Sequence, residues 1–472
     1  MPEGETTIDA LIGNLKKRTT PAPNIEDIKS ELDPDKHKVM STIERKKRRV
    51  TKERMGKDMN GRPTKEEYED DEEVNRIALA IQDLIVERAV AFLFGNEPVM
   101  TGDIVTDGEK AITKLVEKIK LANKVDAINR QVARTVFSAT EAAEFWFPVP
   151  AENYTKYGVP TQFKLRSKIY DPLKGYELFP RFDESGDFVV FSVQYKRTDG
   201  INDTTYFEVF TEQERAVFSR KGVSDWEVEK YGAHAIGKMP IIYCNQKEVE
   251  WKRVQNLIER LETLLSNFAD AIDYHAWPKI FFEGVLKGFM KKGETGGILH
   301  GETGSKAQYL SWDHAPTSVK LEIETLLGQI YTLTQTPNIS FENVKGLGGL
   351  SGIALKLMFL DAHLKVKNKE EIFNSYLQRR NSILIAYAGL LDTSLDAESK
   401  SLDLYDVIKP YMIEDIKEMV ETLMAANGNQ PIMPQKESVR ISPYANNPED
   451  DYKQIQEETK QRNSFDAFET TN

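Results

Sequence analysis

Two glycine-rich stretches of the chain resemble nucleotide-binding motifs, but neither has the spacing that such chemistry requires. Residues 301–306 contain two glycines, a serine and a lysine. A phosphate-binding loop needs four residues between its glycines and a lysine directly after the second, and both spacings differ here. Residues 346–352 resemble a dinucleotide fingerprint, yet Ser351 occupies its third small position and a helix, where a strand is required, is predicted before it. A nucleotide-dependent enzyme using Gly346–Gly352 is therefore kept only as an alternative.

The titratable and nucleophilic residues form no catalytic or metal-binding pattern either. The six histidines, at positions 37, 234, 275, 300, 314 and 363, have no metal-ligand spacing such as two histidines four apart on a helix. No serine lies in a nucleophile-elbow sequence, and Cys244 has no histidine motif near it, so a packed thiol is the simpler interpretation. The sequence thus predicts no catalytic residue, no metal and no cofactor.

The composition excludes some classes of function. The 472 residues carry 75 Asp and Glu against 63 Lys and Arg, which gives a net charge of −12. Tight nucleic-acid binding relies on clustered basic residues that neutralise phosphates, so a conventional tight binder is disfavoured. Loose passage of DNA stays possible, because an acidic or neutral wall would let a duplex slide. The single cysteine excludes an internal disulfide.

No membrane association is predicted. The longest apolar run, Ile383–Leu391, is far too short to span a bilayer. The first residues include Glu3 and Glu5 and do not have the pattern of a signal peptide. We expect a soluble chain with two to four modules.

The predicted elements centre on a glycine-rich loop between two helices. Residues 317–336 carry apolar side chains mostly at three- and four-residue steps, which is typical of a helix with one buried stripe, and Pro337 ends it. The loop Pro337–Leu350 has three glycines among residues 346–349, which makes its second half conformationally free. Ser351 is a candidate N-cap of a helix to Leu391, about 60 Å long if unbroken.

Such a long helix, with a polar middle at Lys365–Glu371, cannot be buried on all sides in a monomer of this size. Packing against copies of the same chain is one interpretation. An ordinary helical hairpin in an α+β enzyme is the other.

The first third of the chain is predicted to be an arm followed by helices. Residues 1–35 are polar, with one short helix near Ile8–Leu15 that would need a neighbour for order. Lys36–Lys57 holds ten basic residues against two acidic ones, which suggests either nucleic-acid contact or a solvated surface, and the acidic run Glu66–Glu73 would partly neutralise it. The helical periodicity then predicts three helices, at Val74–Phe94, Gly108–Val125 and Ala127–Glu144.

The rest of the chain alternates strands and helices. From Thr161 to about Tyr243, segments rich in Val, Phe, Tyr and Thr predict an antiparallel meander. The remaining predicted elements are a helix at Lys247–Tyr274, strands at Lys279–Val285, Gly297–His300, Gln308–Trp312 and Leu402–Ile408, helices at Ile413–Ala426 and Pro448–Arg462, and a disordered tail from Asn463. A small β module thus lies between two long helices.

Taken in this order, the elements resemble the portal (connector) protein of tailed bacteriophages, of the type found in siphophages. The resemblance covers about Val74–Arg462 and depends on three motifs in combination. They are the run NRIALAIQDLIVERAVAFLFGNEPV at Asn75–Val99, the Ile-Tyr-Asp-Pro at Ile169–Pro172 with its meander, and TQTPNISFENVKGLGGLSGIALK at Thr334–Lys356.

The resemblance implies a predominantly helical α+β fold with portal architecture, assembled as a ring around an axial channel. It implies an N-terminal arm at 1–73, a wing at 74–246, stem helices at 247–276 and 317–336, a clip at 277–316, a tunnel loop at 337–350, a long helix returning to the wing at 351–412, a crown at 413–462 and a disordered tail at 463–472. The long charged arm and the compact crown depart from the family pattern.

The resemblance also implies a function without catalysis. The ring, of twelve subunits, would form the channel for DNA packaging and ejection at one capsid vertex of the virion, after assembly in the host bacterial cytoplasm. Its partners would be further copies of the chain, double-stranded DNA, the terminase large subunit, head-completion or adaptor proteins, and capsid and scaffolding proteins. A helical scaffold protein that assembles through its long helices is a further alternative.

Two sets of residues are the candidate functional sites. The DNA-facing residues of the tunnel loop would be Asn343, Val344, Lys345, Gly346, Leu347, Gly348 and Gly349. The partner-docking residues of the clip would be Lys279, Phe281, Lys287, Lys291, Lys292 and Lys306. Lys345 is the only basic residue of its loop, so each copy could touch a phosphate weakly and release it.

Overall fold

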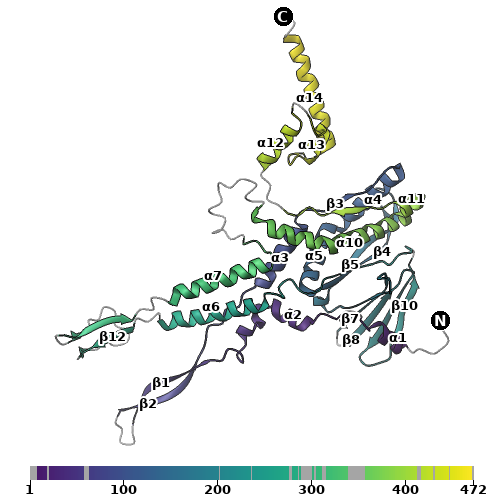
Figure 1. Cartoon of the computed structure of the whole chain (residues 1–472). Helices are drawn as coiled ribbons and strands as arrows, with labels where there is room; N and C mark the ends of the chain where they lie inside the picture. The colour runs from purple at the N-terminus through teal and green to yellow at the C-terminus, as the bar shows by residue number, and fades with distance from the viewer. Residues whose placement is uncertain are drawn as a thin grey trace. The chain divides into compact units, whose positions relative to one another are not determined.

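The computed structural model of the chain describes residues 8–18, 21–57, 63–200, 202–234, 236–275, 279–284, 286–288, 300–301, 304–310, 315–338, 357–411, 416–428, 431–445 and 447–469. The chain divides into two compact units. The first contains Met1–Pro337 and Asp361–Pro410, and the second contains Asn338–Leu360 and Tyr411–Asn472. Helices and strands are mixed throughout, as the predicted α+β class requires (Figure 1).

The N-terminal helix α1 (Ile8–Leu15) lies at its predicted position and has the neighbour that its order requires. Its Ile12 and Leu15 are buried in a cluster with Phe179, Phe207, Phe218 and Trp226. A second helix, α2 (Ile25–Leu32), begins at Asn24, whose side chain accepts a hydrogen bond from the backbone of Asp27.

The basic segment forms a hairpin with the acidic run that follows it. Strand β1 (Arg48–Lys57) pairs antiparallel with β2 (Pro63–Glu72), in a register that sets Arg48 opposite Glu72. Lys52 forms ion pairs with Asp70 at 2.7 Å and with Glu72 at 3.2 Å. The predicted partial neutralisation is therefore confirmed, and it takes the form of cross-strand pairs.

Two of the three predicted helices after the arm need corrected boundaries. Helix α3 (Ile81–Phe94) starts seven residues after Val74, because residues 73–80 are extended. Helix α5 (Val125–Ala139) ends before Glu144, because Thr140 adopts a left-handed φ of 65° and Glu141 begins a strand. Helix α4 (Asp107–Asn123) agrees with prediction and starts at a capping box of Thr106 and Glu109.

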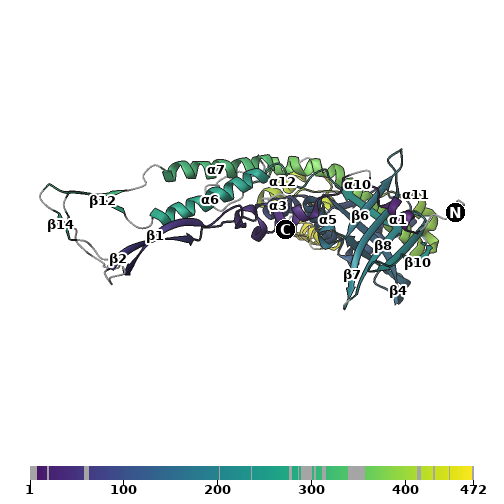
Figure 2. The ribbon, with the colours of Figure 1, turned by 90° about the horizontal axis from the view of Figure 1, so that it is seen from below.

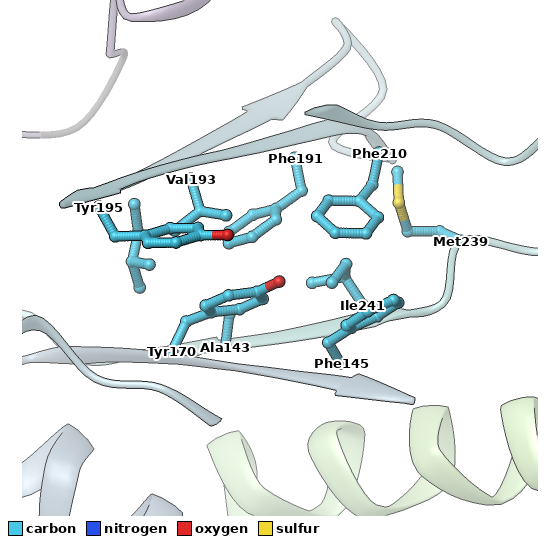
Figure 3. Packing of buried hydrophobic residues seen from close by; sticks show 10 residues of the cluster. Ala143, Phe145, Tyr170, Phe191, Val193, Tyr195, Phe210, Met239 and Ile241 are labelled. Atoms are coloured by element: carbon cyan, nitrogen blue, oxygen red, sulfur yellow. The ribbon is translucent and has the colours of Figure 1, made fainter. Parts of the chain in front are cut away.

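The predicted meander begins earlier and is split between two sheets. One sheet has the order β11-β4-β5 and the other β10-β9-β8-β7-β6. The strands are β4 (Glu141–Tyr154), β5 (Thr161–Tyr170), β6 (Glu177–Phe182), β7 (Phe188–Asp199), β8 (Asn202–Phe210), β9 (Glu214–Lys221), β10 (Glu227–Ala233) and β11 (Ile241–Asn245). Their apolar faces meet in one core, where Phe145, Tyr170 and Ile241 face Phe191, Tyr195 and Phe210 (Figure 3).

Two long helices follow and lie side by side in both views (Figures 1 and 2). They are α6 (Gln255–His275) and α7 (Ala315–Leu333). Helix α6 begins eight residues after the predicted start at Lys247, since residues 248–254 form turns. Between the two helices the chain forms short strands, which are β12 (Lys279–Glu283), β13 (Leu286–Gly288), β14 (His300–Gly301) and β15 (Lys306–Leu310). β12 pairs with β15, and β13 with β14.

The long helix is α10 (Leu360–Leu391), with 32 residues, and its predicted start at Ser351 lies outside the described residues. It packs on its own chain through buried polar groups. Arg380 and Glu144 are both 0% exposed, and the guanidinium donates to the carboxylate at 2.8 and 3.1 Å. The hydroxyl of Tyr376 also donates to Glu144, at 2.6 Å. In the polar middle that favoured self-packing, Lys365 and Lys369 both pair with Glu250 of the same chain.

The chain then forms the 3-10 turn η4 (Thr393–Leu395), helix α11 (Asp396–Ser401) and strand β16 (Tyr405–Val407), which pairs with β3 (Val99–Thr101). In the second unit, helices α12 (Ile416–Ala426), α13 (Gln435–Ile441) and α14 (Pro448–Glu469) are described. The tail from Asn463 was predicted to be disordered, which is wrong up to Glu469. After Pro448 no proline or glycine interrupts this helix.

Candidate functional site

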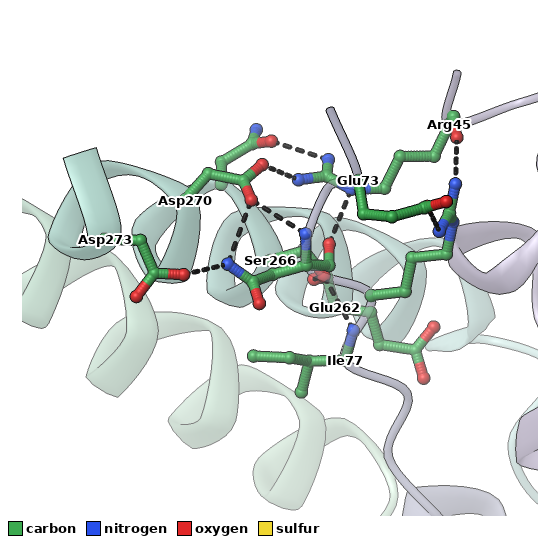
Figure 4. A network of polar contacts seen from close by, with 10 residues as sticks. Arg45, Glu73, Ile77, Glu262, Ser266, Asp270 and Asp273 are labelled. Atoms are coloured by element: carbon green, nitrogen blue, oxygen red, sulfur yellow. Dashed lines mark hydrogen bonds and ion pairs between the residues drawn. The ribbon is translucent and has the colours of Figure 1, made fainter. Parts of the chain in front are cut away.

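Residues 73–80 form an extended segment, the strap, that runs along helix α6 (Figure 4). Alternate backbone N–H groups of the strap donate to side chains spaced four residues apart on the helix. The pairs are Asn75 to Asp270 (2.8 Å), Ile77 to the hydroxyl of Ser266 (2.9 Å) and Leu79 to Glu262 (2.8 Å). The face of α6 therefore accepts the hydrogen bonds that a neighbouring strand would accept.

The spacing of alternate donors on the strap matches the spacing of every fourth side chain on α6. Two residues of extended chain advance about 6.6 Å, while four residues of α-helix advance about 6 Å. Acceptors at positions 262, 266 and 270 can thus follow donors at 75, 77 and 79 over this short distance. This pairing explains why the apolar periodicity failed as a helix signal here, since the backbone donors of the strap are already satisfied.

The same face of α6 also holds the root of the hairpin. Arg45 forms an ion pair with Asp270 at 2.5 Å and donates to the backbone oxygen of Asn75 at 2.8 Å. Arg76 donates to the backbone oxygen of Arg45 at 3.0 Å, and Lys47 pairs with Glu73. Both ends of the β1–β2 hairpin are therefore tied to each other and to α6.

A buried histidine lies beside the strap. His37, between the 3-10 turns η1 (Pro34–Lys36) and η2 (Lys38–Met40), places Nδ1 2.6 Å from the carboxylate of Glu262 and Nε2 3.0 Å from the backbone oxygen of Glu31. Both partners are acceptors, so only the doubly protonated ring donates to both. The hydrogen bond that His37 donates to the carboxylate of Glu262 raises the pKa of His37, although burial opposes this change.

The base of the predicted tunnel loop is held on its first side. Arg88 of α3 donates to the backbone oxygen of Pro337 at 2.5 Å, and Lys365 of α10 donates to that of Thr334 at 3.0 Å. Gln335 adopts a left-handed φ of 51°, which turns the chain out of α7. The chain thus leaves α7 from a fixed point.

Glu250 holds Lys365 in place, and Lys365 in turn holds the end of α7. It pairs with Lys365 at 2.7 Å and also with Lys369, and its side chain is buried. Burial alone would raise the pKa of Glu250, but the two ammonium groups bring it below its ordinary value. Burial lowers the pKa of Lys365, and Glu250 opposes that change. The cluster joins α10, the end of α7 and the segment before α6.

The predicted loop and clip residues are only partly described. Asn343, Val344, Lys345, Gly346, Leu347, Gly348 and Gly349 lie outside the described residues, as do Lys291 and Lys292. Lys279 and Phe281 lie on β12, Lys287 lies on β13 and Lys306 begins β15. Glu283 pairs with Lys306 in the register of β12 and β15, so the pairing brings two predicted docking segments together. The Phe281 side chain is 55% exposed.

The helix pair α6–α7 exposes apolar side chains. Leu321 is 65% exposed, Leu333 51% and Ile272 47%. Arg260 and Glu322 form a bidentate contact between the helices at 2.7 and 3.0 Å, which fixes their relative register. Single exposed leucines are ordinary, but three large apolar groups on one pair of helices leave surface that a partner can bury.

The described residues offer little for catalysis. Cys244 is buried, and burial raises its pKa to about 12, so a thiolate is absent at neutral pH. A cavity of about 860 Å³ lies against β4, β5, β9 and β10, and no carboxylate lines it. Among the described residues no group of His, Cys, Asp and Glu could hold a metal ion, and no helix is long and apolar enough to cross a membrane.

Several residues that organise the site were missed by the sequence analysis. Arg88, His37 and the strap acceptors gave no motif, because their partners are distant in sequence or are backbone atoms. One usable signal exists for α6, since Glu262, Ser266 and Asp270 place polar groups at four-residue steps along one side of an amphipathic helix. Such a polar row indicates a partner that needs acceptors.

Solved structures of known proteins resemble about three quarters of the chain. Three solved structures of gene transfer agent particles resemble it distantly, with TM-scores of 0.40, 0.40 and 0.37 and identities of 10%, 11% and 10%. They are the neck of an empty particle computed with C6 symmetry, the neck of a native particle computed with C12 symmetry and the virion of a native particle; the likeness covers 75%, 77% and 75% of this chain and 86%, 88% and 86% of those chains. No curated protein matches the chain.

The family assignment does not depend on these distant likenesses. The model of the family described as "Phage portal protein, SPP1 Gp6-like" matches residues 24–464. The match includes the strap, the helix pair, both predicted sites and the second unit up to residue 464. The chain therefore belongs to the SPP1 Gp6-like family of phage portal proteins, whose members are structural components rather than enzymes.

Proposed function

We propose that copies of this chain form a closed ring at one capsid vertex, with an axial channel through which double-stranded DNA enters and leaves the head. The family match over residues 24–464 carries this proposal. The exposed apolar groups of the helix pair α6–α7 support it, because neighbouring copies would bury them. Twelve subunits are the number that the family resemblance favours.

Within this ring the helix pair would be the stem and the strands β12–β15 the clip at its far end (Figure 2). Residues 74–246 with the long helix would be the wing, and 413–462 the crown. The strap, which fastens the wing segment to α6, would keep the stem at a fixed angle when DNA moves through the channel.

The loop 337–350 would line the channel. Its first side starts from the fixed point made by Arg88 and Lys365. A loop that leaves a rigid base can move only at its free part, where Gly346, Gly348 and Gly349 lie. Lys345 would touch phosphates weakly, since one exposed contact is screened within about 10 Å at ordinary salt.

The clip would be the docking surface for the terminase large subunit during packaging and for head-completion or adaptor proteins afterwards. The exposed Phe281 and the basic residues Lys279, Lys287, Lys291, Lys292 and Lys306 would supply an apolar anchor and a positive rim. Capsid and scaffolding proteins would contact the ring from outside, in the virion and during assembly in the host cytoplasm.

Native mass spectrometry and negative-stain images of the purified chain test the ring. We expect closed rings of one subunit number. A uniform monomer over a range of protein concentrations and salt would contradict the proposal, and nucleotide-dependent association would favour the enzyme alternative instead.

A pair of loop variants tests the channel. Gly348→Pro should reduce packaging more than Lys345→Ala, because a proline stiffens the part that must follow the duplex, and both variants should still form rings. Full packaging by Gly348→Pro would show that this loop does not follow DNA. Deletion of Gly288–Lys306 should leave rings that no longer bind terminase, and unchanged motor-driven packaging would contradict the clip assignment.

A further inference from the structure

The β1–β2 hairpin leaves both of its outer edges open. Its two strands of ten residues pair with each other, and neither pairs with another described strand. Each outer edge therefore presents a row of backbone N–H and C=O groups to whatever lies beside it. The described side chains of both strands are exposed or half-buried.

The two open edges carry opposite charge. Strand β1 has five basic residues and one acidic residue, whereas β2 has six acidic residues and one basic residue. The hairpin as a whole is almost neutral, so it has no basic face of the kind that binds phosphates. Its charge is separated across the ribbon, from one edge to the other.

Contacts at the base of the hairpin fix its direction relative to α6. The contacts of Arg45, Arg76 and Asn75 with each other and with Asp270 join both strands to α6 (Figure 4). A two-stranded ribbon without further cover is only marginally stable in water. A fixed root and marginal strands indicate an element that is completed by a neighbour.

We propose that this neighbour is the hairpin of the next copy of the chain, so that the basic edge of β1 pairs with the acidic edge of β2 around the ring. The inference rests on the ring of the proposed function. In a ring all hairpins point the same way, which places β1 of one copy antiparallel to β2 of the next. A head-to-tail contact of this kind forms a closed ring when the rotation from one copy to the next adds up to a full turn. Opposite charges favour pairing of β1 with β2, and like charges disfavour pairing of two equal edges.

The pleat of the sheet makes the proposal testable position by position. Thr51 lies opposite Glu69 in the hairpin, so Thr51 shares a face with Glu67, Glu69 and Asp71 and not with Tyr68 or Asp70. If the pairing continues from copy to copy, side chains on one face of a hairpin lie on the same face of the whole sheet. A cysteine at position 51 should then reach cysteines at 67, 69 or 71 of the next copy, within the about 3.5–4.5 Å that a disulfide spans between Cβ atoms.

The experiment is oxidation of rings from two co-expressed chains, one carrying Thr51→Cys and the other a single cysteine in β2. Because each chain has one introduced cysteine, a disulfide between the introduced cysteines must join two chains. Glu67→Cys, Glu69→Cys and Asp71→Cys are the test partners, Tyr68→Cys and Asp70→Cys are matched controls on the other face, and the parent chain controls for the buried Cys244. Gel electrophoresis without reductant reads the product.

We expect disulfide-linked dimers with at least one of the three test partners and none with the two controls. Equal cross-linking on both faces, a dominant dimer of Thr51→Cys with itself, or intact rings without cross-links would each overturn the pairing. The last outcome would indicate that another protein covers the edges. Loss of rings in the parent chain would instead contradict the proposed function, and native mass spectrometry of the same samples separates the two failures.

Discussion

The two-sheet core and the helix pair α6–α7 differ in how much of their apolar surface is buried within the chain. In the core, aromatic side chains of two sheets face each other, and on the opposite face of β4 the buried Glu144 has its charge partner, Arg380 of α10, within the same chain. The helix pair satisfies its polar groups with the strap but leaves Leu321 and Leu333 exposed. One region buries its side chains within a single chain, and the other leaves apolar side chains exposed.

The largest effect on folding should come from the buried ion pair between α10 and β4. Arg380→Leu leaves the carboxylate of Glu144 buried without its cation, which costs about 3–5 kcal/mol. We expect a loss of this size in urea unfolding followed by the fluorescence of Trp146, which is buried on β4. The control Lys110→Ala breaks an exposed pair with Asp107 and should cost less than about 1 kcal/mol. Equal stability of both variants would show that the core does not depend on this pair.

A smaller effect is expected at the strap. Ser266→Ala removes the acceptor for the N–H of Ile77 and should cost about 1–3 kcal/mol, because that buried donor is left without a partner. Amide hydrogen exchange should accelerate at Ile77 more than in the two sheets of the core. Thr263→Ala is the matched control, since its hydroxyl bonds only to the helix backbone at Glu259. Equal exchange at Ile77 in both variants would mean that the strap is held by packing alone.

Local periodicity predicted most elements and missed the strap for a definable reason. Apolar spacing predicts a buried face, and it placed both ends of α4 and α7 within a few residues of their observed bounds and the end of α10 at Leu391. Residues 75–79 carry the same spacing, but their conformation is decided by acceptors on α6, almost two hundred residues away. Contacts of this kind cannot be read from a window of neighbouring residues.

The candidate sites show the same limit. The motifs at Asn75–Val99 and Thr334–Lys356 identify the family, which the match over residues 24–464 confirms. They do not reveal that Arg88 and Lys365 hold the base of the loop, because both donate to backbone oxygens, which any residue type carries. A side-chain pattern predicts partners only where the partner is also a side chain of restricted type.

The stability of the strap should depend on pH through His37, unlike that of the core. The raised pKa of His37 means that its stabilising contribution is complete below the ordinary value of 6.5 and is lost as pH rises through the folded-state pKa. The neutral ring keeps one of its two donors, so the loss is about 0.5–1.5 kcal/mol. We expect the protection of the Leu79 amide, measured relative to the exchange rate of an unstructured amide at the same pH, to fall as pH rises from 6.5, because this N–H shares Glu262 with His37. His37→Gln should remove this difference, and persistence in that variant would assign it to another group.

The smallest effect on folding is expected at the exposed apolar side chains of the helix pair α6–α7. Leu321→Ser replaces a side chain that is 65% exposed, so the free energy of unfolding of a single chain should change by less than about 0.5 kcal/mol. The same change places a hydroxyl where a neighbouring stem helix would pack, and rings should dissociate at lower protein concentration. Leu321→Met, which keeps the apolar surface, and Lys320→Ser, one residue away and charged, are the controls that should assemble normally. Native mass spectrometry over a dilution series measures assembly, and urea unfolding of dissociated chains measures folding. If Leu321→Ser lowers the stability of the single chain as much as Ser266→Ala does, the helix pair is already covered within one chain and its contrast with the core disappears.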